Sequence, residues 1–202
     1  MSALKNFNFT QEYTLENDRV LLRPLALADV SLLEKYVTEE PDLWSYSLVA
    51  IKDSADLENY IKDAIKARIE KTAYPFIVFD KLTKTFVGST RFYDLQLTFA
   101  TTQLGYTWYS KKVWGTGFNQ HCKFLLLQFA FDQMKLDRVE FRADNNNKRS
   151  IAAMQKIGCT IEGVLRNHLP MPNGSRRDSI VLSILKEEWN ATLKTNLEVQ
   201  LK

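Results

Sequence analysis

The sequence predicts a mixed α/β fold of the α+β type, in which helices flank a mostly antiparallel sheet. Short segments rich in aromatic and β-branched residues alternate with longer segments whose apolar residues recur every three or four positions. Two strand-like segments, 74–80 and 86–95, flank a short turn, as in an antiparallel hairpin. The chain has 202 residues and is 45% hydrophobic, so we expect a single domain over residues 1–202 with a sizeable core.

The first part of the chain is predicted to hold one strand and two helices. Residues 19–23 form the strand, and a helix begins at Asp29 and ends before Pro41. The next helix is capped by Asp53 or Ser54 and continues to about residue 70. Its apolar residues line one side and its charged residues the other, which is typical of a helix packed on a core.

Three sequential antiparallel strands should follow. Residues 74–80 and 86–95 are rich in Phe, Ile and Val, and the turn 81–84 joins them as a hairpin. Residues 103–108 then provide the fourth strand of the chain. Because these strands are consecutive, we expect them to be neighbours in the sheet.

A loop with two glycines connects the fourth strand to a long apolar helix. The loop holds Gly115 and Gly117, Lys112 stands at its entrance, and the helix should run from about Gln120 to Met134 with Asn119 or a near neighbour opening it. A glycine loop before a buried helix leaves backbone N–H groups unpaired at the positive end of the helix dipole. Phosphate is the expected occupant of such a site.

Two common phosphate motifs do not fit this loop. A Walker loop ends in Gly-Lys-Ser/Thr, which does not follow Gly115. A dinucleotide fingerprint needs a small residue three positions after Gly117, where Gln120 stands. A tight strand-to-helix turn without any ligand explains the loop equally well, so both interpretations stay open.

The last third of the chain should add three strands and a short helix. Residues 138–143 alternate as in a half-buried strand, and the helix that begins near Asn147 ends at Gly158, a common C-terminal position for glycine. Residues 160–166 and 179–185 form the remaining strands. The tail from residue 186 is helical or frayed.

Composition excludes several classes of function. The 27 basic and 24 acidic residues give a net charge of +3 without a basic block, so we expect no nucleic-acid partner. Residues 1–10 lack a signal-like apolar region and no apolar run is long enough to span a bilayer, so we expect no membrane association. Cys122 and Cys159 lie in apolar contexts outside metal spacing, so we expect no metal site and a cytoplasmic location.

Two motifs resemble those of a known enzyme family. Lys112-x-x-Gly115-x-Gly117 resembles the Gln/Arg-x-x-Gly-x-Gly/Ala pyrophosphate loop of the GCN5-related N-acetyltransferases (GNAT), with Lys in the first position. Asn147-x-x-Ser150, followed by Gly158-Cys159 and Glu162-Gly163, resembles the late motif of the RimJ/RimL-type branch, with Cys159 in place of the usual Phe. With both motifs in register, the resemblance covers residues 19–189, which we take as the domain core.

The resemblance implies a central sheet splayed around its fourth strand, with acetyl-CoA in the resulting V. In that arrangement, backbone groups of a bulged strand hold the acyl and pantetheine part and loop amides bind the pyrophosphate. Asn147 would hydrogen-bond the pantetheine arm, and Ser150, the implied catalytic residue, would protonate the departing thiolate. The implied cofactor-binding residues are Thr107, Trp108, Tyr109, Lys112, Val113, Gly115, Thr116, Gly117, Phe118, Asn119, Asn147 and Ser150. Helix capping explains Asn147 and Ser150 equally well, and the two roles can coexist.

The implied reaction is direct transfer, in which an amine attacks the acetyl carbonyl and CoA leaves as the thiol. The base is not identified by the motifs. His121 stands where many relatives have Glu, and Leu169 stands where the ribosomal-protein acetylases of this branch have Glu. The other candidate bases are His168, Asp178, Glu140 and Glu162.

The leading hypothesis is therefore an acetyl-CoA-dependent N-acetyltransferase that acts on a primary amine, either a protein N-terminus or a small molecule. Two alternatives stay open: a CoA-binding module without catalysis, and a protein interaction domain that uses Trp44, Tyr46 and nearby aromatic residues. The sequence also leaves open whether two copies associate as a homodimer.

Overall fold

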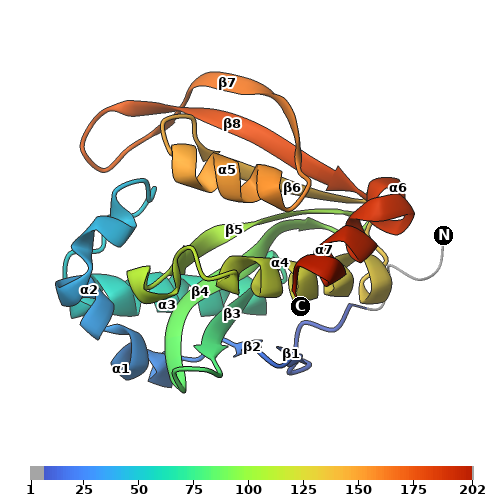
Figure 1. Cartoon of the computed structure of the whole chain (residues 1–202). Coiled ribbons are helices and arrows are strands. Elements are labelled where there is room, and N and C mark those ends of the chain that lie inside the picture. Colours follow the sequence, from blue (N-terminus) through green and yellow to red (C-terminus); the bar gives the residue numbers. More distant parts are fainter. Residues whose placement is uncertain (1–6, 202) are drawn as a thin grey trace.

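The computed structural model describes residues 7–201, whose eight strands form one sheet with helices on both faces (Figure 1). The strand order is β1-β2-β3-β4-β5-β6-β8-β7, and all neighbouring pairs are antiparallel except β5 and β6. The predicted mixed fold with a mostly antiparallel sheet is confirmed. The strands are β1 (Leu15–Glu16), β2 (Val20–Pro24), β3 (Ala73–Asp80), β4 (Thr85–Gln96), β5 (Thr101–Tyr109), β6 (Arg138–Asp144), β7 (Thr160–Pro170) and β8 (Arg176–Leu185).

Seven α-helices are described, together with short 3₁₀ and π-helical turns. The helices are α1 (Val30–Leu33), α2 (Lys35–Glu39), α3 (Ser54–Ile69), α4 (Phe118–Gln128), α5 (Lys148–Lys156), α6 (Lys186–Glu188) and α7 (Lys194–Gln200). The 3₁₀ turns are Leu27–Asp29, Pro41–Trp44 and Lys111–Val113, and the π-helical turns are Phe129–Gln133 and Trp189–Leu193. No helix within residues 7–201 combines the length and apolar character needed to cross a bilayer.

Most predicted elements are confirmed, and the exceptions are local. The helix predicted from Asp29 is wrong as a single element, because a 3₁₀ turn and two short helices occupy its place. The helix predicted from Gln120 begins two residues earlier and ends in the turn Phe129–Gln133. The short strand β1 was not predicted, so the fourth predicted strand is β5.

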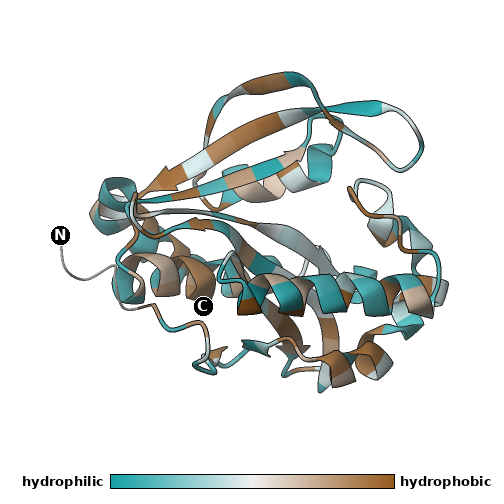
Figure 2. Ribbon diagram, turned by 180° about the vertical axis from the view of Figure 1, so that it is seen from behind, coloured by the Kyte–Doolittle hydropathy of each residue, from teal (hydrophilic) through white to brown (hydrophobic). Residues whose placement is uncertain are grey.

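A separate hydrophobic core lies on each face of the sheet. On β3, Tyr74 and Phe76 join the core beneath α4, whereas Ile77 joins the core beneath α3, as the two-residue period of a strand requires. The α3 core includes Leu57 and Ile61, two members of the predicted apolar stripe. Seen from behind, α3 shows a mainly hydrophilic outer face, whereas β8 carries hydrophobic stretches (Figure 2).

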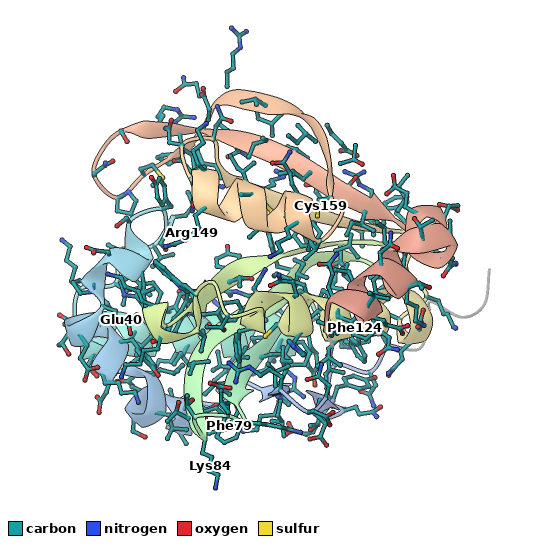
Figure 3. All side chains as sticks on the ribbon, viewed as in Figure 1. Glu40, Phe79, Lys84, Phe124, Arg149 and Cys159 are labelled. Carbon is teal, nitrogen blue, oxygen red and sulfur yellow. The ribbon has the colours of Figure 1, made fainter. Side chains whose placement is uncertain are left out.

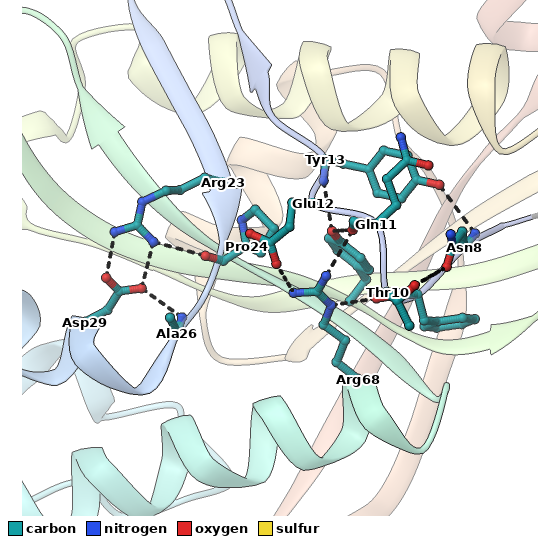
Figure 4. Close-up of polar contacts among 12 residues, drawn as sticks. Asn8, Thr10, Gln11, Glu12, Tyr13, Arg23, Pro24, Ala26, Asp29 and Arg68 are labelled. Atoms are coloured by element: carbon teal, nitrogen blue, oxygen red, sulfur yellow. Dashed lines mark hydrogen bonds and ion pairs between the residues drawn. The ribbon is translucent and has the colours of Figure 1, made fainter.

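Two arginines fasten the N-terminal part of the chain to this framework (Figure 4). The Arg68 guanidinium donates to the carbonyl oxygens of Phe9 and Gln11 at 2.8 and 2.9 Å. Arg23 binds the Asp29 carboxylate through two nitrogens, at 2.6 and 3.0 Å. Residues 9–11 are therefore held in place by hydrogen bonds to α3, whereas Leu15–Glu16 pair with β2 in the sheet.

The sheet splits between β5 and β6, as the predicted splay around the fourth strand requires. These two strands pair only where residues 101–103 lie beside residues 138–140, and no further pair joins them in the part of the chain that the structure describes. β5 also bulges, because Ser89 pairs with Trp108 and Arg91 with Gly105, so that two residues of β5 oppose one of β4. Tyr106, inside the bulge, has φ = 50°. The split and the bulge lie at the same point, which opens a V in the middle of the sheet.

The C-terminal segment ties the two halves of the split sheet together. Trp189, which follows β8, is fully buried and lies 5.7 Å from the Phe131 ring and 5.8 Å from the Phe124 ring. Lys194 adds an ion pair to Asp132 at 2.6 Å. The predicted helical tail is therefore a packed element that contacts α4.

Candidate active site

A cavity of about 530 Å³ fills the V between β5 and β6. Ten of the twelve predicted cofactor-binding residues line it, namely Thr107, Trp108, Tyr109, Val113, Gly115, Gly117, Phe118, Asn119, Asn147 and Ser150. Lys112 and Thr116 are exposed and do not line the cavity. The Thr116 hydroxyl instead donates to the Val113 carbonyl at 2.8 Å, which stabilises the turn. The structure thus brings together residues from two motifs that are about 30 positions apart.

The glycine loop has the geometry of an anion cradle. Gly115 and Gly117 have φ values of 74° and 81°, and a Cβ built on either would meet nothing within 4 Å. Gly117 is the N-cap of α4 and offers no side chain to cap it. The backbone amides of residues 115–119 find no acceptor among residues 7–201. Free amides, the positive end of the α4 dipole and open space therefore coincide.

At the start of α5, Asn147 and Ser150 take part in the helix cap and also line the cavity. Asn147 is the N-cap, and its Oδ1 accepts from the Ser150 amide at 3.0 Å. Both residues are half-buried and line the cavity. The capping bond uses only the Oδ1 atom of Asn147 and the amide of Ser150, so the Asn147 Nδ2 group and the Ser150 hydroxyl are available to a ligand.

The mouth of the cavity is bridged by residues from three segments. The Arg149 guanidinium lies 3.4 Å from the centroid of the Trp114 ring, and the Tyr46 hydroxyl donates to the Asn146 carbonyl at 3.5 Å. These residues also line an adjacent hollow of about 410 Å³. Figure 3 shows Arg149 on the side of α5 that faces the segment after α2.

Lys123 is a buried cation at the floor of the cavity that the motif analysis did not single out. Only 5% of it is exposed, and its Nζ donates to the Thr107 hydroxyl at 3.0 Å. It makes no ion pair with a carboxylate of the described residues. Desolvation lowers the pKa of its ammonium group to about 8. The sequence did offer one signal for this buried lysine, because Lys123 interrupts the apolar stripe of the helix that became α4.

The predicted base candidates separate into one residue inside the cavity and four outside it. The Arg138 guanidinium binds the Glu162 carboxylate and lowers its pKa to about 2, and Arg138 and Arg142 both pair with Glu140. The remaining outside candidates also have partners: His121 hydrogen-bonds Asn17, and Asp178 accepts from the Asn167 amide.

His168 is the one member of that candidate set that lines the cavity. Its Nδ1 lies 3.0 Å from the Ser179 hydroxyl oxygen. Desolvation, with Arg142 and other nearby arginines, lowers the pKa of its imidazole, which favours the neutral form that can accept a proton. Within residues 7–201, no group of three His, Cys, Asp or Glu side chains is placed to bind a metal ion.

Comparison with known proteins identifies the family of the chain. Residues 19–160 match the family model of the GNAT acetyltransferase domain. The chain is 25% identical over 177 residues to p20, an uncharacterized N-acetyltransferase of Bacillus licheniformis, covering 87% of this chain and 98% of that one.

Solved structures show the same fold. A GCN5-related N-acetyltransferase from Brucella melitensis aligns with a TM-score of 0.87 at 22% identity, over 98% of this chain and 90% of that one. Mycobacterium smegmatis RimJ, in complex with CoA-disulfide, aligns with a TM-score of 0.78 at 18% identity, over 94% and 93% of the two chains. The chain described here belongs to the GNAT family of acetyltransferases, which use acetyl-CoA as the acetyl donor.

Proposed function

We propose that this chain binds acetyl-CoA in the V between β5 and β6 and transfers its acetyl group directly to a primary amine. The observation that carries the proposal is the row of unpaired amides at residues 115–119, which opens into the cavity at the start of α4. A diphosphate is the CoA group that suits such a site, because it accepts several amide hydrogen bonds at once.

The other residues would act in sequence along the cofactor. The bulged backbone at Thr107, Trp108 and Tyr109 would hold the acyl and pantetheine part and polarise the acetyl carbonyl. Asn147 would bind the pantetheine arm through its Nδ2 group. As the amine nitrogen bonds to the acetyl carbon and the C–S bond breaks, the Ser150 hydroxyl would give its proton to the thiolate. His168, which lines the cavity, would accept the proton that the amine loses, and proton exchange with water would restore both His168 and Ser150.

Thiol release on mixing the protein with acetyl-CoA and a panel of primary amines tests the proposal. We expect release that depends on both substrates, and isothermal calorimetry should show CoA binding without an amine. CoA binding without turnover of any amine would instead support a module that binds CoA and lacks catalysis.

We predict that Ser150→Ala lowers kcat by about 10- to 100-fold, because the thiolate loses its proton donor. CoA affinity should change by less than about threefold, since the Asn147 cap bonds the Ser150 amide rather than its hydroxyl. Ser31→Ala, on the exposed surface of α1, serves as a matched control and should retain wild-type kcat. An unchanged kcat in Ser150→Ala would remove Ser150 from the reaction.

A further inference from the structure

The face of the split sheet opposite α4 and α5 carries side chains that the proposed cofactor site does not use. On β6, Val139, Phe141 and Ala143 join the core beneath α4 and α5, so Arg142 and Asp144 point to the other face. β8 continues this face, because its Ser179 lies directly opposite Asp144. An amine that approaches the V from this face would meet the acetyl group from the side opposite α4 and α5.

Arg177 is a buried cation on this face that makes no direct ion pair with the described residues. Desolvation lowers the pKa of its guanidinium, and the charge of the Asp144 carboxylate acts on it and opposes that lowering. Only 9% of it is exposed, and its Nε donates to the Ser179 hydroxyl at 2.9 Å. It makes no ion pair with any carboxylate of residues 7–201 and it lines the cavity. Its neighbour Arg142, by contrast, is paired with Glu140 at 2.7 Å. A buried guanidinium that no carboxylate contacts directly is costly, and an anionic ligand that contacts it would reduce that cost.

A second unpaired arginine lies on the same side. Arg91 is 7% exposed and makes no ion pair within the described residues. Its guanidinium lies 3.5 Å from the centroid of the Tyr106 ring and 5.0 Å from that of Tyr60. Tyr106 in turn lies 5.0 Å from Tyr93, edge to face, and Tyr93 also lines the cavity. Arg91 does not itself line the cavity, but it contacts two aromatic rings that do, those of Tyr60 and Tyr106.

The two aspartates of the cavity wall form no ion pair with these arginines within the described residues. Asp94 accepts hydrogen bonds from Gln96 and Gln103, and Asp144 accepts from the Asn146 amide. Two indole N–H groups of the wall, those of Trp44 and Trp108, also lack an acceptor among the described residues. In the part of the chain that the structure describes, the acceptor side thus offers indole donors without an acceptor and a buried guanidinium without an ion pair.

We infer that the acceptor is a small molecule that carries a carboxylate beside its primary amine, as a free amino acid does. This inference rests on the proposed function. Arg177 would bind the carboxylate, since a guanidinium matches its two oxygens with parallel hydrogen bonds. The same positive charges would lower the pKa of the bound amine and so favour its nucleophilic, neutral form. A polypeptide N-terminus has a neutral amide where this carboxylate would lie.

Thiol release should be measured with L-amino acids, with their carboxamides and with alanyl peptides. We expect kcat/KM for at least one amino acid to exceed that of its carboxamide by about 100-fold, because the amide leaves Arg177 unpaired. Equal or faster turnover of carboxamides or peptides would overturn the inference and leave the proposed function standing. No turnover of any amine, with CoA still bound, would count against the proposed function itself.

Variants then test the assigned residue. Arg177→Gln should raise KM for the amino acid by about 30-fold or more while CoA affinity stays unchanged, and Arg177→Lys should recover part of the loss. Arg176→Gln removes the same charge one residue away, where the exposed Arg176 donates to the Asn167 carbonyl, and should keep the wild-type KM. An equal rise of KM in both variants would overturn the assignment of Arg177. The comparison of amino acids with carboxamides uses the wild-type protein, so it stands even if a variant does not fold.

Discussion

Replacing Gly115 with Glu should weaken CoA binding by at least about 100-fold. At φ = 74° any side chain strains the backbone by roughly 1–2 kcal/mol, and the new Cβ would project into the open space of the cradle. A carboxylate there would repel the diphosphate at the positive end of α4. Isothermal calorimetry with CoA measures the loss directly.

Gly174→Glu separates charge at the cradle from backbone strain in general. Gly174 lies in the β7–β8 turn, has φ = 84°, and likewise has nothing within 4 Å of its built Cβ. The substitution introduces the same side chain at a similar backbone conformation, outside the cavity lining. CoA affinity should stay within about twofold of wild type. If both variants lost affinity equally, or neither did, the diphosphate would have to bind elsewhere.

Lys123→Met should raise the free energy of unfolding by about 1–3 kcal/mol at pH 7. A pKa of about 8 in the folded protein, against 10.5 for an ordinary lysine, corresponds to at most about 3 kcal/mol of destabilisation of the charged form. Methionine has a similar length and no charge to desolvate. Thr107 keeps its hydrogen bond to the Thr90 hydroxyl at 2.7 Å, so no buried hydroxyl is orphaned.

The same substitution should remove a pH dependence. Below pH 8 the folded and unfolded chains are both protonated at Lys123, and the folded state bears the whole cost of desolvation. Between about pH 8 and 10.5 the unfolded chain holds more protons, so the stability of the wild type should rise with pH relative to Lys123→Met. Urea unfolding at pH 7, 8 and 9.5 measures this difference. Lys66→Met, at an exposed lysine of α3, is the control and should change stability by less than about 0.5 kcal/mol.

Local chemistry was sufficient to predict much of this fold. The apolar stripe of α3, the hairpin β3–β4 and the cap at Asn147 each depend on residues close together in the chain, and all are confirmed. The two glycines were informative for the same reason, because their positive φ values and the start of α4 are local properties. That the loop and Asn147 line one cavity is also in accord with the sequence motifs.

Features that depend on particular strand pairings and side-chain contacts, rather than on periodicity, were not predicted. β1 has only two residues and exists because it pairs with β2. The helix predicted from Asp29 breaks into short pieces, where the carboxylate of Asp29 is held by Arg23. Burial of Arg177 follows from how β6 and β8 meet, and its own neighbours in the chain do not indicate it. Periodicity can place a side chain on one side of an element, but it cannot show what that side will face.

The short parallel pairing of β5 and β6 determines which way the V can widen. Pairing of residues 101–103 with residues 138–140 holds the two strands together at one end. Trp189, which follows β8, packs on Phe124 and Phe131 and so joins the two halves there. That paired end would act as the hinge of any opening motion. Any opening of the protein must therefore be greatest near Asp144 and the Arg149–Trp114 contact, and smallest at the closed end of the V. A change in the distance between the two halves would then control the entry of ligands, while the closed end of the V keeps its shape.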